Sequence, residues 1–516
     1  MNKRYRIFSL FITSILILAM LSGCVNTGST PQEKTFNYGT MAYGVAMGNV
    51  GLNPHEGYSG WSTIRYGVGE TLFKFNESME LEPWLATDYE QIDEYTVRIN
   101  LRDDVTFSNG NKMTGEAVKD CLENLIAVHD RAPSDLQIKS IEADGQSITI
   151  TSNIKVPGLV NYLCDPYGTI IDMEAGVTED KNVVGTGPYI ATRVTDTEIN
   201  LISNDNYWNG EVIVNNINVK SITDGDTLTM ALQSGDIDAA QGLPYVSLQL
   251  FQDDPDYTIS STNTSRLYQA ALNFRSKLIQ DDAVREAMAL SMDKEGFTSV
   301  LLQGNGSPAI GPYPANFTFG GDAVRADEYD IDKARDILED AGWIDSDGDG
   351  IREKDGKRLT IRWLTYTSRQ ELPLLAESVQ ATYKEAGIEV LVNATDNFRD
   401  FLQSGEYDVY ASAFVAAPTG DPQYYFTTHV VDGSDYNRGY YRNDNVEKLV
   451  EKLREEFDTE RRSGLAVEIA QQVLDDRAYI YASHLKMSFV MRNGVAGFTA
   501  HPSDYYEITS KLDIDK

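Results

Sequence analysis

Five histidines, His55, His129, His429, His484 and His501, are the side chains best suited to chemistry in this chain. Neutral imidazole is the commonest side-chain ligand for nickel, zinc and copper. His55, His429 and His501 fall in loop-like segments, where binding residues concentrate. We therefore predict these three as metal ligands, with an ordinary loop histidine as the alternative for each.

The other two histidines have simpler interpretations. His484 lies in the apolar segment Ala478–Phe489, which is typical of a buried core. His129 follows a predicted helix, where a positive charge interacts favourably with the helix dipole.

Two further chemical patterns are incomplete. Asp345–Gly350 (DSDGDG) is similar to the start of a calcium loop, but Gly356 stands where the twelfth-position glutamate belongs. A turn-rich connection from a helix to a strand is the favoured interpretation. Gly-x-Ser-x-Gly, His-Glu-x-x-His and phosphate-loop patterns do not occur in the sequence, so we expect no enzyme and no catalytic cofactor.

The elements that must position these residues alternate between helical and strand patterns, which predicts a mixed α/β fold. Thr114 is predicted to open a helix that continues to about Val128. The further helices are predicted at Asp282–Met292, Asp332–Ala341, Glu371–Ala386, Val446–Phe457 and Ser463–Leu474, and the strands at Phe36–Ala46, Thr96–Leu101, Ser147–Thr151, Arg358–Thr365 and Glu389–Val392.

The N-terminus has the layout of a secretory signal peptide, residues 1–23, with basic residues before the apolar run Ile7–Met20. Leu21–Cys24 (LSGC) resembles the lipobox of bacterial lipoproteins, in which the cysteine is acylated. This predicts a lipid anchor at Cys24, a tether over residues 24–35 and an extracytoplasmic location at the cell membrane. The alternative is a short membrane anchor with an incidental cysteine.

Composition limits the partners of the chain. Its 516 residues carry 78 acidic and 44 basic side chains, so the surface repels nucleic acid and anionic lipid. About 490 residues would remain after the signal peptide, enough for two or three lobes. Cys121 and Cys164 are either a disulfide, which an extracytoplasmic location permits, or buried free thiols.

Several short phrases occur in an order that resembles one family. They are Leu52–His55 (LNPH), Glu82–Ala86 (EPWLA), Leu101–Gly110 (LRDDVTFSNG), Gly185–Tyr189 (GTGPY), Asn204–Trp208 (NDNYW), Ala283–Ala287 (AVREA), Lys333–Arg335 (KAR) and Ala341–Trp343 (AGW). Together they resemble the peptide- and nickel-binding family of ABC-importer substrate-binding proteins, solute-binding family 5. The resemblance covers nearly the whole mature chain.

The resemblance implies a bilobed, periplasmic-binding-protein-like (type II) α/β fold with mixed sheets and an inserted subdomain. Lobe I would comprise residues 36–62, 183–271 and 490–516, the inserted subdomain residues 63–182, and lobe II residues 272–489. It further implies a monomer that closes on its ligand and delivers it to an ABC permease.

The family also suggests ligand-binding residues. The phrase Ala500–Tyr506 (AHPSDYY) looks like the tail of the nickel-binding lipoprotein members, and Arg131 matches an arginine that holds the carboxylates of a small chelator. Three aromatic residues beside the candidate histidines, Tyr58, Trp61 and Tyr424, are further candidates. The stretch Phe414–Gly420 lacks the tryptophan of the best-known nickel binders, which favours direct ligation by histidine.

These observations predict a receptor for nickel, either free or chelated by histidine or another small metallophore. The alternative is a di- or oligopeptide receptor. In peptide-binding relatives, an aspartate in a Gly-Asp-Pro context pairs with the amino group of the peptide, and Asp421 stands in that context here. A simple Asp-Pro turn is the other interpretation of Asp421.

Overall fold

The computed structural model describes residues 33–45, 48 and 50–515. The predicted signal peptide, Cys24 and the tether up to residue 32 lie outside the described residues. Within the described ranges, no helix combines the length and apolar character that crossing a membrane requires.

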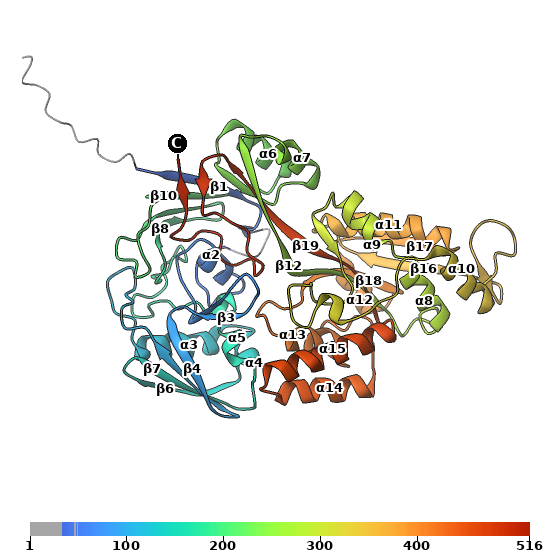
Figure 1. Ribbon diagram of the computed structural model, residues 1–516, viewed down its shortest axis with the longest axis horizontal. Coiled ribbons are helices and arrows are strands. Elements are labelled where there is room, and N and C mark those ends of the chain that lie inside the picture. The colour runs from blue at the N-terminus through green and yellow to red at the C-terminus, as the bar shows by residue number, and fades with distance from the viewer. Residues whose placement is uncertain (1–32, 46–47, 49, 516) are drawn as a thin grey trace, which may run out of the picture.

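One mixed sheet of eleven strands runs through both halves of the molecule (Figure 1). Its order is β17-β16-β18-β12-β19-β11-β1-β10-β9-β8, and β13 pairs with β19 beside this path. The strands are β1 (Thr35–Thr40), β8 (Tyr189–Val194), β9 (Glu198–Ser203), β10 (Asn216–Ser221), β11 (Ala239–Gln241), β12 (Tyr257–Leu272), β13 (Gly306–Pro308), β16 (Thr360–Thr365), β17 (Glu389–Ala394), β18 (Val409–Val415) and β19 (Tyr479–Arg492).

Two long antiparallel strands, β12 and β19, connect the lobes (Figure 1). Their register runs from Tyr257 opposite Arg492 to Ala271 opposite Tyr479, with a shift between Asn263 and Leu267. The first half of β12 belongs to the lobe of β1 and β10, and its second half pairs with β18 in the other lobe. Each strand therefore contributes to both lobes. The sequence did not predict β12, because it far exceeds the usual strand length.

Helices cover the sheet of lobe II (Figure 1). Most predicted helices are confirmed, with ends that shift by a few residues. The helices of this lobe are α8 (Asp282–Leu290), α9 (Lys294–Gly296), α10 (Ile331–Asp340), α11 (Glu371–Glu385), α12 (Phe398–Ser404), α13 (Gln423–Tyr425), α14 (Asp444–Glu455) and α15 (Thr459–Asp475). The short helices α9, α12 and α13 were not predicted from the sequence. In α14 the buried residues Val446, Leu449, Val450 and Leu453 recur at helical spacing, which is why this segment folds as an amphipathic helix.

A separate four-stranded sheet lies within the predicted inserted subdomain. Its order is β4-β5-β7-β6, and helix α3 (Gly115–Val128) contacts β6 and β7. As predicted, Thr114 caps α3, because its side chain accepts a hydrogen bond from the Ala117 amide at 3.2 Å. Cys121 and Cys164 are buried free thiols, which excludes the disulfide alternative. The strands are β4 (Ala86–Asp93), β5 (Thr96–Leu101), β6 (Ile138–Asp144) and β7 (Ser147–Ser152).

The family-like phrases around Gly185 and Asn204 meet at a buried carboxylate. Glu70 accepts hydrogen bonds from Thr186 Oγ1 at 2.9 Å, Tyr207 OH at 2.7 Å and Trp208 Nε1 at 2.8 Å. Burial raises the pKa of Glu70 to about 7. These phrases therefore have a structural role, because they join residues 186–208 to the segment that carries Glu70.

Candidate ligand-binding cavity

A cavity of about 310 Å³ lies where the two lobes face each other, which is enough room for a small ligand. One wall comes from the segments around α2 (Gly60–Arg65), α4 (Ala132–Leu136) and the short helix η2 (Pro166–Gly168). The other comes from β12, β18, α13 and the loop before α11. The lining residues are Ala42, Tyr58, Trp61, Arg65, Arg131, Asp165, Arg266, Arg369, Ala413, Phe414, Val415, Pro418, Tyr424 and Tyr436. We call this the interlobe cavity.

Two further hollows, one smaller and one larger than the interlobe cavity, adjoin it. A hollow of about 100 Å³ shares Trp61, Arg65 and Arg266 with the interlobe cavity. A second hollow of about 410 Å³ shares Ala42 and Arg369 with both. The binding region can therefore extend beyond the interlobe cavity itself.

Two of the four arginines that line the cavity have acidic partners. Arg65 forms an ion pair with Asp504 and lies 3.4 Å from Glu507 Oε1. Arg131 Nη2 lies 3.2 Å from Asp165 Oδ1, and its guanidinium lies over the ring of Tyr58. The charges of these arginines are therefore balanced within the protein.

The other two arginines face the cavity without such partners. Across the described ranges, the guanidinium groups of Arg266 and Arg369 make no hydrogen bond and no ion pair. Burial and the like charge of Arg369 lower the pKa of the Arg266 guanidinium, although it stays protonated. Two positive charges without an ion-pair partner thus line a cavity in a chain whose net charge is −34.

Aromatic residues make up half of the remaining lining residues. Phe414 stacks on Tyr424 with 5.7 Å between ring centroids and contacts Tyr436 at 5.5 Å. Trp61 meets Tyr505 edge to face at 5.0 Å. A cavity with aromatic sides and two guanidinium groups free of ion pairs favours a small ligand that offers apolar or ring surface and carries negative charge.

His55 lies outside the lining of the cavity. It is 3% exposed, with Nδ1 2.7 Å from Asn124 Nδ2 and Nε2 3.7 Å from Cys121 Sγ. A cysteine, a histidine and an asparagine also form nucleophilic sites in some proteases. Here burial raises the pKa of the Cys121 thiol to about 12, so it stays protonated. Burial also lowers the pKa of His55 to about 4.

His429 lies directly behind the aromatic wall. It belongs to η5 (Phe426–Val430), a π-helical turn, and its ring stacks between those of Tyr425 and Tyr436. Its Nδ1 lies 2.9 Å from Thr428 Oγ1, and burial lowers its pKa to about 3. The imidazole is therefore packed as part of the wall.

His501 is also engaged within the protein. Its Nδ1 lies 2.7 Å from Ser503 Oγ and accepts a hydrogen bond from the Ser503 amide at 3.2 Å. Its ring meets Tyr506 edge to face at 4.8 Å, and burial lowers its pKa to about 4. Like His55 and His429, it does not line the interlobe cavity.

The predicted three-histidine metal site is not assembled. Over the residues that the structure describes, only one group of three or more histidine, cysteine or carboxylate side chains brings its ligand atoms within 4.8 Å of one another. That group contains no histidine. Direct ligation by a single histidine stays a prediction.

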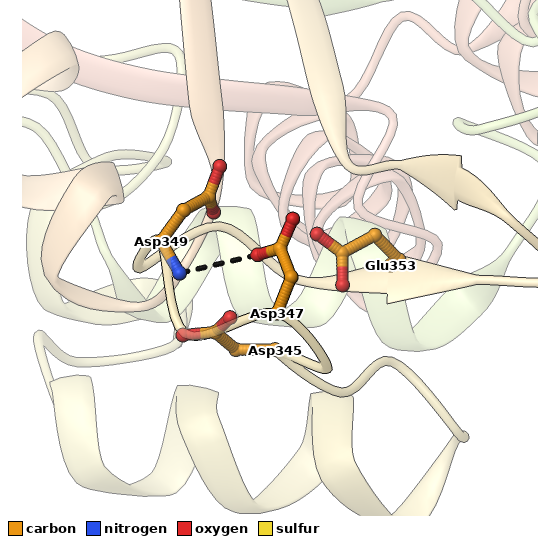
Figure 2. Close-up of side chains that lie close together, drawn as sticks. All are labelled: Asp345, Asp347, Asp349 and Glu353. Atoms are coloured by element: carbon orange, nitrogen blue, oxygen red, sulfur yellow. Dashed lines mark hydrogen bonds between the residues drawn. The ribbon is translucent and has the colours of Figure 1, made fainter.

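The group that does converge is the acidic loop between α10 and β14 (Glu353–Lys354), shown in Figure 2. Asp345, Asp347 and Asp349 are exposed, and each accepts hydrogen bonds from backbone amides of the same loop. Asp349 also pairs with Arg358, and Glu353 accepts from Ser346 at 3.0 Å. These bonds fit the turn-rich helix-to-strand connection predicted from the sequence.

Asp421, the predicted partner of a peptide amino group, does not line the interlobe cavity. Arg462 holds its carboxylate with Nη2 at 2.6 Å and Nε at 3.1 Å, and both side chains are buried. Asp421 also accepts from the Gln423 amide at 2.8 Å. It lines a different hollow, between the predicted inserted subdomain and the predicted lobe II, and Arg462 already balances its charge.

Four predicted ligand-binding residues do meet in the interlobe cavity: Tyr58, Trp61, Arg131 and Tyr424. Sequence reasoning missed Arg266 and Arg369. Arg266 lies on the unpredicted strand β12. Arg369 follows β16, which is parallel to both β17 and β18. The carboxyl end of a parallel strand is a common ligand position, so that signal was present in principle.

Comparison with known proteins gives a consistent result. The family described as bacterial extracellular solute-binding proteins, family 5 middle, matches residues 80–437. The nickel-binding protein NikA of Staphylococcus aureus is 26% identical over 99% of this chain and all of its own length. The oligopeptide-binding protein AppA of Bacillus subtilis is 24% identical, and the match covers 98% of each chain.

A solved structure supports the fold. The crystal structure of NikA from Staphylococcus aureus in complex with Ni(L-His)2 has a TM-score of 0.76 and 26% identity. The match covers 93% of this chain and all of that one. The predicted bilobed α/β fold is thereby confirmed.

Proposed function

Because the chain belongs to the bacterial extracellular solute-binding proteins of family 5, we propose that it captures nickel as a carboxylate-bearing chelate in the interlobe cavity. The cavity would close on this ligand and present it to the permease of an ABC importer. Nickel is here the transported cargo. The protein itself makes and breaks no covalent bond.

The unpartnered pair Arg266 and Arg369 carries this proposal. Two guanidinium groups that share a cavity repel a bare divalent cation and attract carboxylates, which they can bind in two places. A chelating ligand satisfies both demands, because it surrounds the metal and turns carboxylate oxygens outward. The cost of holding two like charges near each other then falls when the ligand binds.

The comparisons support the metal. The Staphylococcus aureus relative is described as nickel-binding, and its structure contains Ni(L-His)2. The proposed site differs from the sequence-based one, since Arg266 and Arg369 hold the chelate together with Arg131, Tyr58, Trp61 and Tyr424. His55, His429 and His501 support the walls.

The location follows from the N-terminal sequence and the family. We propose that the signal peptide is removed, that Cys24 carries the lipid and that the residues between Cys24 and β1 form a tether. The predicted bound at residue 35 is too late by at least one residue, because Thr35 belongs to β1. An anchored monomer of this kind stays beside its permease while its lobes remain free to close around the ligand.

A peptide is the second candidate, for a specific reason. Arg369 lines both the interlobe cavity and the adjoining hollow of about 410 Å³, so a longer ligand with a terminal carboxylate has space there. The oligopeptide-binding relative from Bacillus subtilis fits this alternative. The neutralised Asp421 speaks against it, because it leaves no free carboxylate at the predicted position of the peptide amine.

Calorimetric titration of the full-length chain tests the proposal. The injected solutions are Ni²⁺ alone, Ni²⁺ with excess L-histidine, and a mixture of di- and tripeptides. We expect tight binding only with nickel and histidine together. Tight peptide binding without a response to nickel would overturn the nickel proposal in favour of the second candidate.

A further inference from the structure

His129 does not line the interlobe cavity, yet it contacts the backbone beside two residues that do. We infer that His129 is a positioning residue. Its neutral imidazole fixes the backbone that carries Arg131 to the loop that carries Tyr58, and losing or protonating the ring weakens ligand binding. The inference rests on the proposed function, because ligand binding in this cavity is one of its readouts.

The hydrogen bonds of His129 define one tautomer. Nδ1 accepts from the backbone amides of Arg131 and Ala132, both at 3.1 Å. A nitrogen that accepts hydrogen bonds carries no proton, so the ring proton lies on Nε2. Nε2 lies 3.2 Å from the Gly57 carbonyl oxygen and donates to it. The side chain is completely buried.

These bonds join two segments of the cavity wall. Gly57 directly precedes Tyr58, and Arg131 precedes α4. The Arg131 guanidinium lies 5.5 Å from the Tyr58 ring centroid and 5.3 Å from that of Tyr167. The imidazole therefore fixes the backbone on both sides of the contact between Arg131 and Tyr58, two residues that line the cavity.

The same geometry makes the link sensitive to acid. Several groups face the ring: Asp130 at 3.4 Å, the Tyr167 ring at 5.1 Å, Arg131, Asp165 and His55. Burial lowers the pKa of His129 and favours the neutral ring that the two backbone amides require. Protonation at Nδ1 would place a proton against these amides and break both bonds. Affinity should therefore fall as the solution becomes acidic.

Three substitutions separate the hydrogen bonds that His129 makes through Nδ1 from the one that it makes through Nε2. H129N keeps an acceptor near the position of Nδ1, H129Q keeps a donor near the position of Nε2, and H129A removes both. Binding of Ni²⁺ with L-histidine to the full-length chain is titrated at neutral pH and at pH values well below the ordinary pKa of histidine, because burial lowers the pKa of His129. We expect H129A to bind about tenfold more weakly, with H129N and H129Q between it and the wild type.

The pH dependence distinguishes positioning from a purely structural cap. Asparagine does not titrate, so the affinity of the wild type relative to H129N should fall on acidification, and protonation of the chelate cancels in this ratio. A constant ratio would overturn the inference, and so would an H129A protein that melts like the wild type and binds with unchanged affinity.

Two measurements without ligand test the inference even if the protein does not bind the nickel chelate. Nitrogen NMR of the imidazole should show the proton on Nε2, and amide exchange at Arg131 and Ala132 should quicken in H129Q but stay slow in H129N. If the wild type binds no chelate, the proposed function fails while these spectra still decide the inference. A proton on Nδ1, or equal exchange in both variants, would overturn it.

Discussion

The cavity arginines and the buried histidines of this protein differ in what their polar atoms contact. The guanidinium groups of Arg266 and Arg369 make no hydrogen bond and no ion pair with the described residues, although both line the interlobe cavity. His55, His429 and His501 lie outside that cavity, and each has a protein partner for Nδ1. The polar groups that lack a protein partner in this comparison are therefore the two guanidinium groups and not the imidazoles.

This difference indicates that the two arginines, and not the three histidines, are free to bind a ligand. A buried imidazole with a lowered pKa and a neighbouring partner contributes to the wall whether or not a ligand is present. Two like-charged guanidinium groups in one cavity gain stability when an anionic group arrives. Histidine identity alone, which guided the sequence-based site, does not capture this.

The largest effect is expected when the charges of Arg266 and Arg369 are removed. We expect R266Q and R369Q each to weaken binding of nickel with L-histidine about tenfold, and the double variant about 100-fold, because each arginine supplies a charge-assisted hydrogen bond. Calorimetry measures the change. R442Q, at an exposed arginine outside the cavity, is the matched control and should bind like the wild type. Unchanged binding by the double variant would contradict the assignment.

A second test concerns the histidines as neutral core residues. Burial lowers the pKa of His484 to about 3, so between pH 6.5 and 3 the unfolded chain binds a proton that the folded chain does not. Stability therefore falls as the pH falls. At pH 5 this histidine should cost about 2 kcal/mol relative to neutral pH.

Urea unfolding of the wild type and H484M at pH 7.5 and pH 5 measures this cost. We expect the wild type to lose about 2 kcal/mol more than H484M, whose side chain does not titrate. Equal losses would show that His484 is charged or exposed in the folded protein.

A third test removes the ion-pair partner of Arg131, so that this arginine resembles Arg266 and Arg369. D165N removes the negative charge beside Arg131, while the asparagine still accepts from the Tyr167 amide. We expect the affinity for nickel with L-histidine to rise about threefold, since the guanidinium becomes available to carboxylates. Weaker binding by D165N would mean that the ion pair orients Arg131 and that its charge is not the limiting factor.

The smallest effect is expected at the histidines themselves. H55N and H501N keep a polar group near Nδ1 but remove the imidazole. Because neither residue lines the cavity, affinity should change by no more than about twofold. A loss of 100-fold in a variant that still folds would restore direct ligation by that histidine.

Much of the fold could be predicted from the sequence, because its signals are local. Thr114 caps α3, and the apolar positions of α14 repeat at helical spacing, so both helices were predicted. Strand β12 was missed because its 16 residues exceed the usual strand length, and because the turn-type residues Asn263 and Ser265 stand where it passes from one lobe into the other.

The site was harder to predict, because residues far away in the sequence determine whether each of its charged side chains is paired. Asp421 is balanced by Arg462, 41 positions later, and Arg65 by Asp504, 439 positions later. Nothing near Asp421 or Arg65 in the sequence shows that these charges are already paired. By contrast, Tyr58 and Trp61 lie beside His55 in the sequence, so they were predicted together with it and do line the cavity.

The most direct test of the central claim compares two chelates of the same metal. Nickel with L-histidine and nickel with histamine both present imidazole and amine nitrogens, but only the first carries carboxylates. If Arg266 and Arg369 select the ligand, calorimetry of the full-length chain should show at least about 30-fold tighter binding with histidine. Equal affinity for the two chelates would contradict the account.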